Sequence, residues 1–236
     1  MSEAKLNETF PQLLGRSVVY TTHEKTVENN ARLYPLDKLG NKLLKRAFDI
    51  VLSAVVLLAV LSWLIPVLAI FIKLTSKGPL FFVQPRTGYN NKTFLCWKLR
   101  SMHVNANADL QQAIRSDSRI TGIGKFIRKF SLDELPQFYN VLMGDMSLIG
   151  PRPHMLKHTE EYSKEVGTYL QRHAVKPGIT GLSQVMGYRG EIANKHALNN
   201  RVRIDIFYLK KWNFGLDLMI IFRTAKLLVL GDKNAY

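Results

Sequence analysis

The longest hydrophobic run in the chain covers Ile50–Ile72, 23 residues without a charged side chain. A helix needs about 20 apolar residues to cross a bilayer, so this run is long enough. Pro66 interrupts it and favours a kink, because proline cannot donate a backbone hydrogen bond. The basic residues that flank the run are Lys45, Arg46, Lys73 and Lys77. They favour the cytoplasmic side for both ends, so the pattern leaves open a kinked transmembrane helix or a re-entrant one.

Shorter periodic segments follow toward the C-terminus. Leu80–Gln84 and Phe94–Met102 are typical of two strands joined by a turn. Gly122–Phe130 predicts a short amphipathic helix, which would suit a membrane surface or packing on a core. Further helices are expected over Val104–Arg115, Met155–His173, Asn200–Trp212 and Phe214–Leu230. Residues 1–37 show weak periodicity and are predicted to be poorly ordered.

Charge changes this picture, because the chain carries a formal net charge of +15. Such an excess is typical of proteins that bind nucleic acid, an anionic membrane surface or phosphorylated substrates. Cys96 is the single cysteine, so an intrachain disulfide is excluded and a reducing compartment is acceptable. Its apolar neighbours favour a small core residue over a nucleophile.

The candidate chemistry lies in Ser131–Gln137, where Asp133 and Glu134 are adjacent. The preceding segment, Lys73–Lys129, contains 11 Lys or Arg and two acids. Many cations ahead of two carboxylates indicate an anionic substrate, and attack by a carboxylate on a phosphate would need them together with a divalent metal. The alternative is a helix cap, because Ser131 and Glu134 have the spacing of a capping box. The heptapeptide alone favours the cap.

Other residues could contact such a substrate. Arg152 lies between two prolines that hold the backbone extended, so its guanidinium would be presented at little entropic cost. His154 and His158 are four residues apart and could share a helix face, but zinc would need further ligands. Lys176–Gly181 is a turn-rich loop that could hold the backbone-facing groups of a ligand.

Seven short motifs, in this order, resemble the bacterial sugar transferases, which are monotopic phosphoglycosyl transferases. The motifs are Lys45–Asp49, Gly78–Gly88, Lys98–Met102, Asp117–Thr121, Ser131–Gln137, Asn140–Pro153 and Lys176–Gly181. The resemblance covers about residues 45–236. It implies an enzyme that moves a sugar 1-phosphate from a UDP-sugar to polyprenyl phosphate and releases UMP. Such enzymes begin the assembly of exopolysaccharides and other glycoconjugates.

The resemblance also implies a role for each carboxylate. Asp133 would be the nucleophile that forms a phosphosugar–enzyme intermediate, and Glu134 would help to hold Mg²⁺ beside it. Four cations are candidate phosphate clamps: Arg86, Lys98, Arg100 and Arg152. Residues expected near the sugar or nucleotide are Arg119, Gln137, Thr180, Gly181 and Gln184.

For the fold, the resemblance implies a mostly helical α/β domain with interfacial amphipathic helices. It favours re-entry over spanning, with Pro66 at the break. Three parts are then expected: a lead over residues 1–44, a re-entrant helix over 45–73 and a catalytic domain over 74–236. The protein would lie on the cytoplasmic face of the bacterial inner membrane, with anionic lipid, UDP-sugar and polyprenyl phosphate as partners and without nucleic acid. A homodimer is left open.

The identity of the sugar depends on loop residues. The ending Asp232–Tyr236 and the segment Gly187–Glu191 resemble members that use UDP-glucose. Leu182 and Met186 depart from the family pattern, in which a larger residue and an asparagine are common. UDP-glucose is therefore favoured, while the polysaccharide and the polyprenol length are not indicated.

Two other classes of function compete with the enzyme. A basic membrane-attached scaffold that binds anionic lipid would explain the charge and the apolar run, but it gives no reason for Asp133 and Glu134. A nucleic-acid-binding module would explain the charge alone, since aromatic residues do not interleave with the basic run in a known readout motif. Release of UMP from a UDP-sugar separates the enzyme from both.

Overall fold

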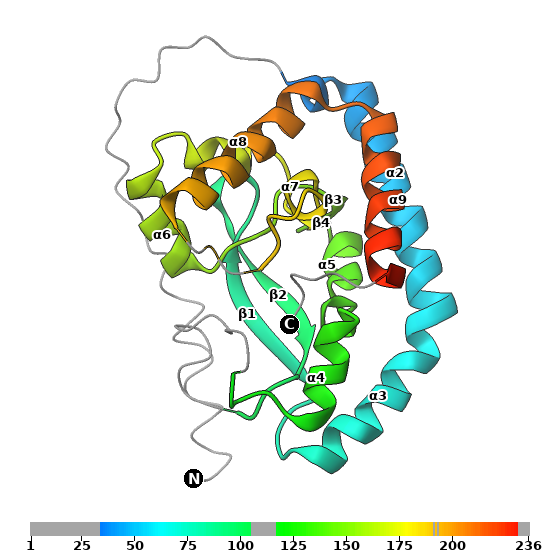
Figure 1. Ribbon diagram of the computed structural model, residues 1–236. Coiled ribbons are helices and arrows are strands. Elements are labelled where there is room, and N and C mark those ends of the chain that lie inside the picture. The colour runs from blue at the N-terminus through cyan, green and yellow to red at the C-terminus, as the bar shows by residue number, and fades with distance from the viewer. Residues whose placement is uncertain (1–33, 105–116, 191, 193, 231–236) are drawn as a thin grey trace. The chain divides into compact units, whose positions relative to one another are not determined.

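Figure 1 shows a computed structural model, which describes residues 34–104, 117–190, 192 and 194–230. This part of the chain is mostly helical and contains two small two-stranded sheets, which confirms the predicted predominance of helix. The helix expected over Val104–Arg115 and most of the lead before Lys38 lie outside the described residues.

The apolar run lies within one continuous helix of 37 residues, Leu39–Thr75. It comprises α2 (Leu39–Val56), a π-helical turn η2 (Leu57–Leu61) and α3 (Ser62–Thr75). Only 17% of its most apolar 18-residue window is buried, so the helix has the length and surface of a membrane helix. In Figure 1 it runs past α9 and continues to α4.

The π-helical turn changes the hydrogen bonding one turn before Pro66. Side chains bind two carbonyl groups here, since Ser62 Oγ donates to Leu58 O at 2.7 Å and Trp63 Nε1 donates to Ala59 O at 3.0 Å. Such contacts matter in a lipid environment, where water cannot satisfy a freed carbonyl. The local irregularity therefore begins before the proline that the sequence singles out.

The predicted hairpin is confirmed, with strands β1 (Phe81–Thr87) and β2 (Thr93–Leu99). They pair antiparallel in a register that places Phe81 opposite Leu99 and Thr87 opposite Thr93. The connection includes the 3₁₀ turn η3 (Tyr89–Asn91), in which Asn90 and Asn91 have positive φ. Asparagine tolerates this conformation better than most residues, which explains the tight connection.

A second sheet was not predicted. Strand β3 (Ser147–Ile149) pairs in parallel with β4 (Gly178–Thr180), which lies in the segment that the sequence indicates as a turn-rich loop. A Cβ atom at Gly178 would lie 2.1 Å from the backbone nitrogen of Gly150, so the two backbones can approach only because both residues are glycine. Pairing with a distant strand makes this segment structural.

The remaining described elements are helices and short helical turns. Their bounds are η1 (Pro35–Asp37), α4 (Gly122–Lys129), η4 (Leu132–Glu134), α5 (Gln137–Met143), α6 (Leu156–Glu165), η5 (Tyr169–Ala174), α7 (Leu182–Val185), α8 (Lys195–Lys211) and α9 (Phe214–Leu230). The predicted α9 is confirmed, the predicted 155–173 segment forms α6 and η5, and α8 begins five residues earlier than predicted. In α4, Ile127 is buried in the core, whereas the apolar side chains of Phe126 and of Phe130, directly after the helix, stay about half exposed.

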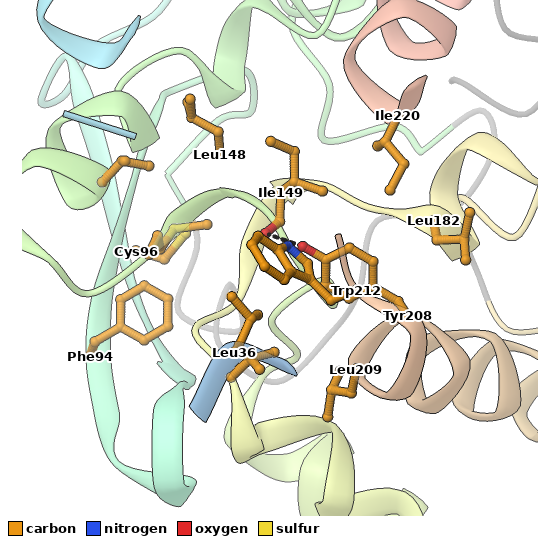
Figure 2. Packing of buried hydrophobic residues seen from close by; sticks show 13 residues of the cluster. Leu36, Phe94, Cys96, Leu148, Ile149, Leu182, Tyr208, Leu209, Trp212 and Ile220 are labelled. Atoms are coloured by element: carbon orange, nitrogen blue, oxygen red, sulfur yellow. Dashed lines mark hydrogen bonds between the residues drawn. The ribbon is translucent and has the colours of Figure 1, made fainter. Parts of the chain in front are cut away.

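Three apolar clusters hold these elements together, and one of them packs Val166 and Tyr169 against Leu198 and Val202 of α8. The largest joins β2, β3, α5, α8 and α9, and Figure 2 shows several of its side chains, including Phe94, Cys96, Ile149 and Trp212. Cys96 is therefore a core residue, as predicted. The remaining cluster consists of Leu68, Ile72, Leu99 and Ile127, with further partly buried residues, and ties α3 to β2 and α4.

The inner face of α2 carries charged side chains that are fully paired, and we refer to Lys45, Arg46 and Asp49 as the α2 anchor. Lys45 Nζ lies 2.7 Å from Asp217 Oδ2 on α9. Asp49 Oδ1 accepts hydrogen bonds from Ser147 Oγ and the backbone nitrogen of Leu148. Arg46 caps carbonyl groups at the end of α5. The anchor fixes the first half of the long helix onto the core.

Candidate active site

The two adjacent carboxylates lie in η4, directly after Ser131, which has a left-handed backbone (φ 56°). The Ser131 side chain makes no cap hydrogen bond, and its Oγ instead accepts one from Arg189 Nη2 at 2.7 Å. The capping alternative is therefore wrong here, because the left-handed residue turns the hydroxyl away from the helical turn. Because η4 is a three-residue 3₁₀ turn, it also provides little helix dipole to favour ionised Asp133.

Asp133 and Glu134 are both buried and line a pocket of about 300 Å³. Cations surround them on several elements. Those that line the pocket are Arg86 from β1, Lys98 from β2, and Arg100, Arg119, Arg128, Arg152, Arg189 and Arg201. The pocket thus brings together all four predicted phosphate clamps, the predicted Arg119 and both carboxylates. Its charge is strongly positive and suits an anionic ligand.

Glu134 is held by two of these cations. Its Oε1 accepts hydrogen bonds from Lys98 Nζ at 2.9 Å and from Arg152 Nη2, and its Oε2 accepts from Arg152 Nη1 at 3.2 Å. Burial by itself disfavours the carboxylate, but Arg152 and Lys98 outweigh it and hold the pKa of Glu134 well below its usual range. Glu134 is therefore a fixed anion.

Asp133 has a different environment, although it is the preceding residue. Among the residues that the structure describes, its carboxylate accepts no hydrogen bond and forms no ion pair within 4 Å. Burial raises the pKa of Asp133, Lys98 opposes this shift and the charge of Glu134 adds to it. Asp133 is thus a basic carboxylate whose oxygens remain available beside a cluster of cations.

Two of the predicted clamps, half-buried Arg86 and buried Arg100, have buried nitrogen atoms without a hydrogen-bond partner. Arg86 donates to Pro153 O at 2.6 Å and to Gln84 Oε1 at 2.9 Å, while its Nε has no partner. Arg100 donates to Ser76 O at 2.7 Å, and its Nε and Nη1 have none. A buried unpaired donor is costly, so these atoms are suited to donate hydrogen bonds to an anionic ligand.

The other predicted residues have different positions. Arg119 lines the pocket and pairs with Asp117 through contacts of 2.6–3.1 Å. Four residues expected near the sugar or nucleotide do not line the pocket: Gln137, Thr180, Gly181 and Gln184. Thr180 Oγ1 lies 2.7 Å from Thr224 Oγ1, and a Cβ atom at Gly181 would lie 2.2 Å from Gly150 O. These residues pack the β3–β4 region, so a contact with substrate stays a prediction.

Several pocket residues were missed by sequence reasoning. Arg128, Arg189 and Arg201 all line the pocket, together with Tyr162. His154 and His158 also line it, but His154 precedes α6, so the two do not share a helix face as considered from the sequence. A signal existed for Arg189, which lies between Gly187 and Gly190, two glycines with positive φ that permit a sharply turned loop. Nothing in the periodicity of α8 distinguishes Arg201 from its solvent-facing neighbours.

Comparison with known proteins gives a consistent result. The family model described as Bacterial sugar transferase matches residues 40–231. The UDP-glucose:undecaprenyl-phosphate glucose-1-phosphate transferase of Klebsiella pneumoniae is 47% identical over 186 residues, 78% of this chain and 40% of that protein. The protein of the same description from Caulobacter vibrioides is 42% identical over 203 residues, 86% of this chain and 75% of that protein.

A relative with another described donor also matches. The UDP-N-acetylgalactosamine-undecaprenyl-phosphate N-acetylgalactosaminephosphotransferase of Aeromonas hydrophila is 41% identical over 189 residues, 80% of this chain and 44% of that protein. The chain thus spans less than half the length of the Klebsiella and Aeromonas proteins. The family match covers the whole pocket, because the residues that line the pocket lie between 79 and 201.

Proposed function

The chain belongs to the bacterial sugar transferase family, and from this premise we propose that it transfers a sugar 1-phosphate from a UDP-sugar to undecaprenyl phosphate, releasing UMP. UDP-glucose is the favoured donor, because relatives described as glucose-1-phosphate transferases are 42–47% identical to the chain. A relative described as an N-acetylgalactosaminephosphotransferase is nearly as similar, so identity alone does not fix the sugar.

One observation carries the proposal, namely the contrast between the two adjacent carboxylates. Glu134 is tied to Lys98 and Arg152, whereas Asp133 faces the same pocket with its oxygens available. A nucleophile needs an accessible lone pair, and a more basic carboxylate attacks better once it is ionised. Asp133 is therefore the better nucleophile of the pair, and Glu134 the better structural anion.

The reaction has two displacement steps. In the first, an Asp133 oxygen forms a bond to the β-phosphorus of the donor, and the bond to the bridging oxygen breaks, so that UMP leaves with the electron pair. In the second, an oxygen of undecaprenyl phosphate bonds to the same phosphorus and Asp133 leaves as a carboxylate. Arg86, Lys98, Arg100 and Arg152 neutralise charge on the phosphate oxygens in both steps.

A divalent metal could still bind beside these carboxylates, because Glu134 Oε2 accepts only one hydrogen bond from the described residues and the Asp133 oxygens accept none. Magnesium prefers oxygen ligands and is usually held by one or two carboxylates together with substrate phosphates and water. The described residues contain no group of three or more potential ligands, so a protein-only cage is not formed there. We propose that Glu134, with Asp133 beside it, holds Mg²⁺ together with donor phosphate, and that the ion supplies further positive charge.

The long helix supports a monotopic placement. Its first half is fixed to the catalytic unit by the α2 anchor, and Leu68 and Ile72 near its end pack against Leu99 and Ile127 of the same unit. A helix with both ends on one compact unit cannot easily place those ends on opposite faces of a bilayer. We therefore propose that residues 45–73 re-enter the cytoplasmic leaflet of the inner membrane, with Pro66 at the bend.

Topology can be tested by labelling. Leu44→Cys and Lys77→Cys are made separately in a Cys96→Ser background and treated with a membrane-impermeant thiol reagent in intact cells. Both positions are expected to react only after permeabilisation, which also serves as the control for accessibility. Labelling of either position from the periplasm would contradict re-entry and favour a spanning helix.

The activity is tested with purified protein, undecaprenyl phosphate and Mg²⁺. UDP-glucose, UDP-galactose and UDP-N-acetylgalactosamine are supplied in turn, and UMP release and the lipid-linked product are measured. UDP-glucose is expected to give the highest kcat/KM. If none of the donors yields UMP above the Asp133→Asn control while the protein still binds anionic vesicles, the enzyme proposal fails and a membrane scaffold is favoured.

A further inference from the structure

A buried ion pair behind the pocket has no role in the steps proposed above. Arg172 in η5 contacts Asp205 in α8, with Nε and Nη2 at 3.0 and 2.6 Å from Asp205 Oδ2. Each side chain is 1% exposed. Burying two charges is costly and often brings no net stability, so the pair calls for another explanation.

The same guanidinium contacts the segment that carries Arg152. Arg172 Nη2 donates to the backbone oxygen of Arg152 at 2.9 Å, and Nη1 lies 3.0 Å from His154 Nδ1. One rigid side chain thus binds the residues on both sides of Pro153. Because the guanidinium is planar and Asp205 holds one edge of it, the backbone of Arg152 has little freedom to move.

These contacts also define the state of His154. Arg172 can only donate, so His154 Nδ1 must accept, and the Tyr169 hydroxyl lies 2.6 Å from the same nitrogen. Burial lowers the pKa of His154 well below its usual value, and Arg172 and Arg201 add to the effect, so the ring is neutral. A neutral ring with Nδ1 as acceptor carries its proton on Nε2.

The Nε2 proton lies on the side of Arg201, which together with His154 lines the pocket. The nearest cation there, Arg201 Nη1, is 3.5 Å away and too distant for a normal hydrogen bond. Arg172 at 3.0 Å therefore decides the tautomer. His154 thus adds an uncharged N–H donor to a pocket that is lined by eight cations.

We infer that Arg172 and Asp205 are positioning residues, which hold the backbone of residues 152–154 so that Arg152 meets Glu134 and His154 keeps its proton on Nε2. This inference rests on the proposed function for the importance of Arg152, but the arrangement itself does not depend on turnover. The pair acts through Arg152 and not on substrate.

Asp217 offers a matched control, because it belongs to a second buried ion pair. Lys45 Nζ lies 2.7 Å from Asp217 Oδ2, and the Asp217 side chain is 0% exposed. This pair lies outside the pocket. It joins α2 to α9, and neither residue lines the pocket. Arg172→Lys keeps a cation for Asp205 but loses the fork that reaches Arg152 and His154. Asp217→Asn breaks a buried pair without touching that segment.

The kinetic test is a double-mutant cycle with Arg152→Lys. Arg172→Lys is expected to lower kcat/KM by at least about tenfold in the wild-type background, and by less than about twofold when Arg152 is already Lys. Asp217→Asn should change kcat/KM of the folded protein by the same factor in both backgrounds. An Arg172→Lys factor that is equal in both backgrounds would reduce Arg172 to a structural residue and overturn the inference.

A spectroscopic test needs no activity. In protein labelled with ¹⁵N-histidine, the His154 signals are assigned by their loss in His154→Gln. They should show a neutral Nε2–H tautomer at pH 7, unchanged in Asp217→Asn and altered in Arg172→Lys. If Arg172→Lys does not fold, Tyr169→Phe, which removes only the hydroxyl, should perturb the same signals.

An Nδ1–H tautomer or an imidazolium in the wild type would contradict the inference even if UMP release is confirmed. If UMP release fails but the tautomer is as expected, only the proposed function is lost.

Discussion

The α2 anchor and the pocket both bury charged side chains, but they balance them differently. In the anchor, Lys45 faces Asp217, and Asp49 accepts hydrogen bonds from β3. Arg46 donates to two carbonyl groups. In the pocket, the described residues place eight cations around two carboxylates, and nitrogen atoms of Arg86, Arg100 and Arg201 have no partner. The anchor is complete without a ligand, whereas the pocket is not.

The two regions differ in how completely their buried charged groups are paired, and this difference separates a structural use of buried charge from a functional one. A complete network stabilises one arrangement of the backbone, as Asp217 does by accepting from Tyr208 and Trp212 as well as from Lys45. An incomplete one has a cost that an anionic ligand would remove. Substitutions in the anchor should therefore act on folding, and substitutions in the pocket should act on turnover.

The largest expected effect is on turnover at the pocket. Asp133→Asn is nearly isosteric but cannot form the covalent intermediate, so kcat is expected to fall by at least about 10⁴-fold. Thermal unfolding should change little or shift upward, because a buried charge is removed. The measurement combines UMP release with a melting curve for each protein. Turnover within tenfold of the wild type would remove Asp133 from the mechanism.

The next largest expected effect is a loss of stability when the ion pair of the α2 anchor is broken. Asp217→Asn removes the carboxylate that contacts buried Lys45 directly, which is expected to lower the free energy of unfolding by about 3–5 kcal/mol. Turnover per folded molecule should stay near the wild-type value, since the pocket is not touched. Denaturant titration in detergent and an assay corrected for the folded fraction measure both quantities. A large loss of turnover with unchanged stability would break the distinction between the two regions.

A smaller effect is expected for Arg152→Lys. The change keeps the positive charge but removes the fork that holds Glu134 through two nitrogen atoms. We expect kcat/KM to fall about 10²-fold, the size of losing one donor to a charged group in an active site. Lys164→Met, at a solvent-exposed pair with Glu160, is the control and should have no measurable effect. Wild-type kinetics in Arg152→Lys would make Arg152 structural.

The smallest effect concerns pH, and the two carboxylates should show opposite signs. The pKa of Glu134 is lowered in the folded protein, so its contribution to stability is present above its ordinary pKa and is lost as the pH falls toward the folded value. The pKa of Asp133 is raised, so ionising it destabilises the fold as the pH rises through that value.

Stability curves of the two variants measure this directly. Relative to the wild type, Asp133→Asn should gain stability as the pH rises above the ordinary pKa of aspartate, and Glu134→Gln should lose it over the range in which wild-type Glu134 is ionised. The same sign for both variants would show that the environments of the two carboxylates do not differ as described.

The sequence predicts elements whose pattern is local. The apolar run, the β1–β2 hairpin and α9 follow from periodicity, and the motif order places Asp133, Lys98 and Arg152 at one site. What periodicity cannot reach is contact between distant segments. The β3–β4 pairing joins residues about 30 positions apart, and their backbones approach closely at Gly150 and Gly178. The segment expected to be a ligand-binding loop therefore contains a strand.

The capping alternative failed for a related reason. The spacing of Ser131 and Glu134 fits a capping box, yet spacing carries no information on φ. The positive φ at Ser131 turns its hydroxyl away from the helical turn that contains Glu134. Arg201 was missed because its role depends on the pocket side of α8, which only packing defines. Short motifs therefore located the two carboxylates of the pocket, while tertiary contacts determined what surrounds them.

The most direct test of the account is whether Asp133 carries the transferred group. Wild-type protein is incubated with radiolabelled UDP-glucose and Mg²⁺ without undecaprenyl phosphate, and label on the protein is compared with UMP released. We expect hydroxylamine-sensitive label on the wild type, one UMP for each label, and loss of the label when acceptor is added, with neither label nor UMP from Asp133→Asn. Equal labelling of Asp133→Asn, or UMP release from the wild type only when acceptor is present, would contradict it.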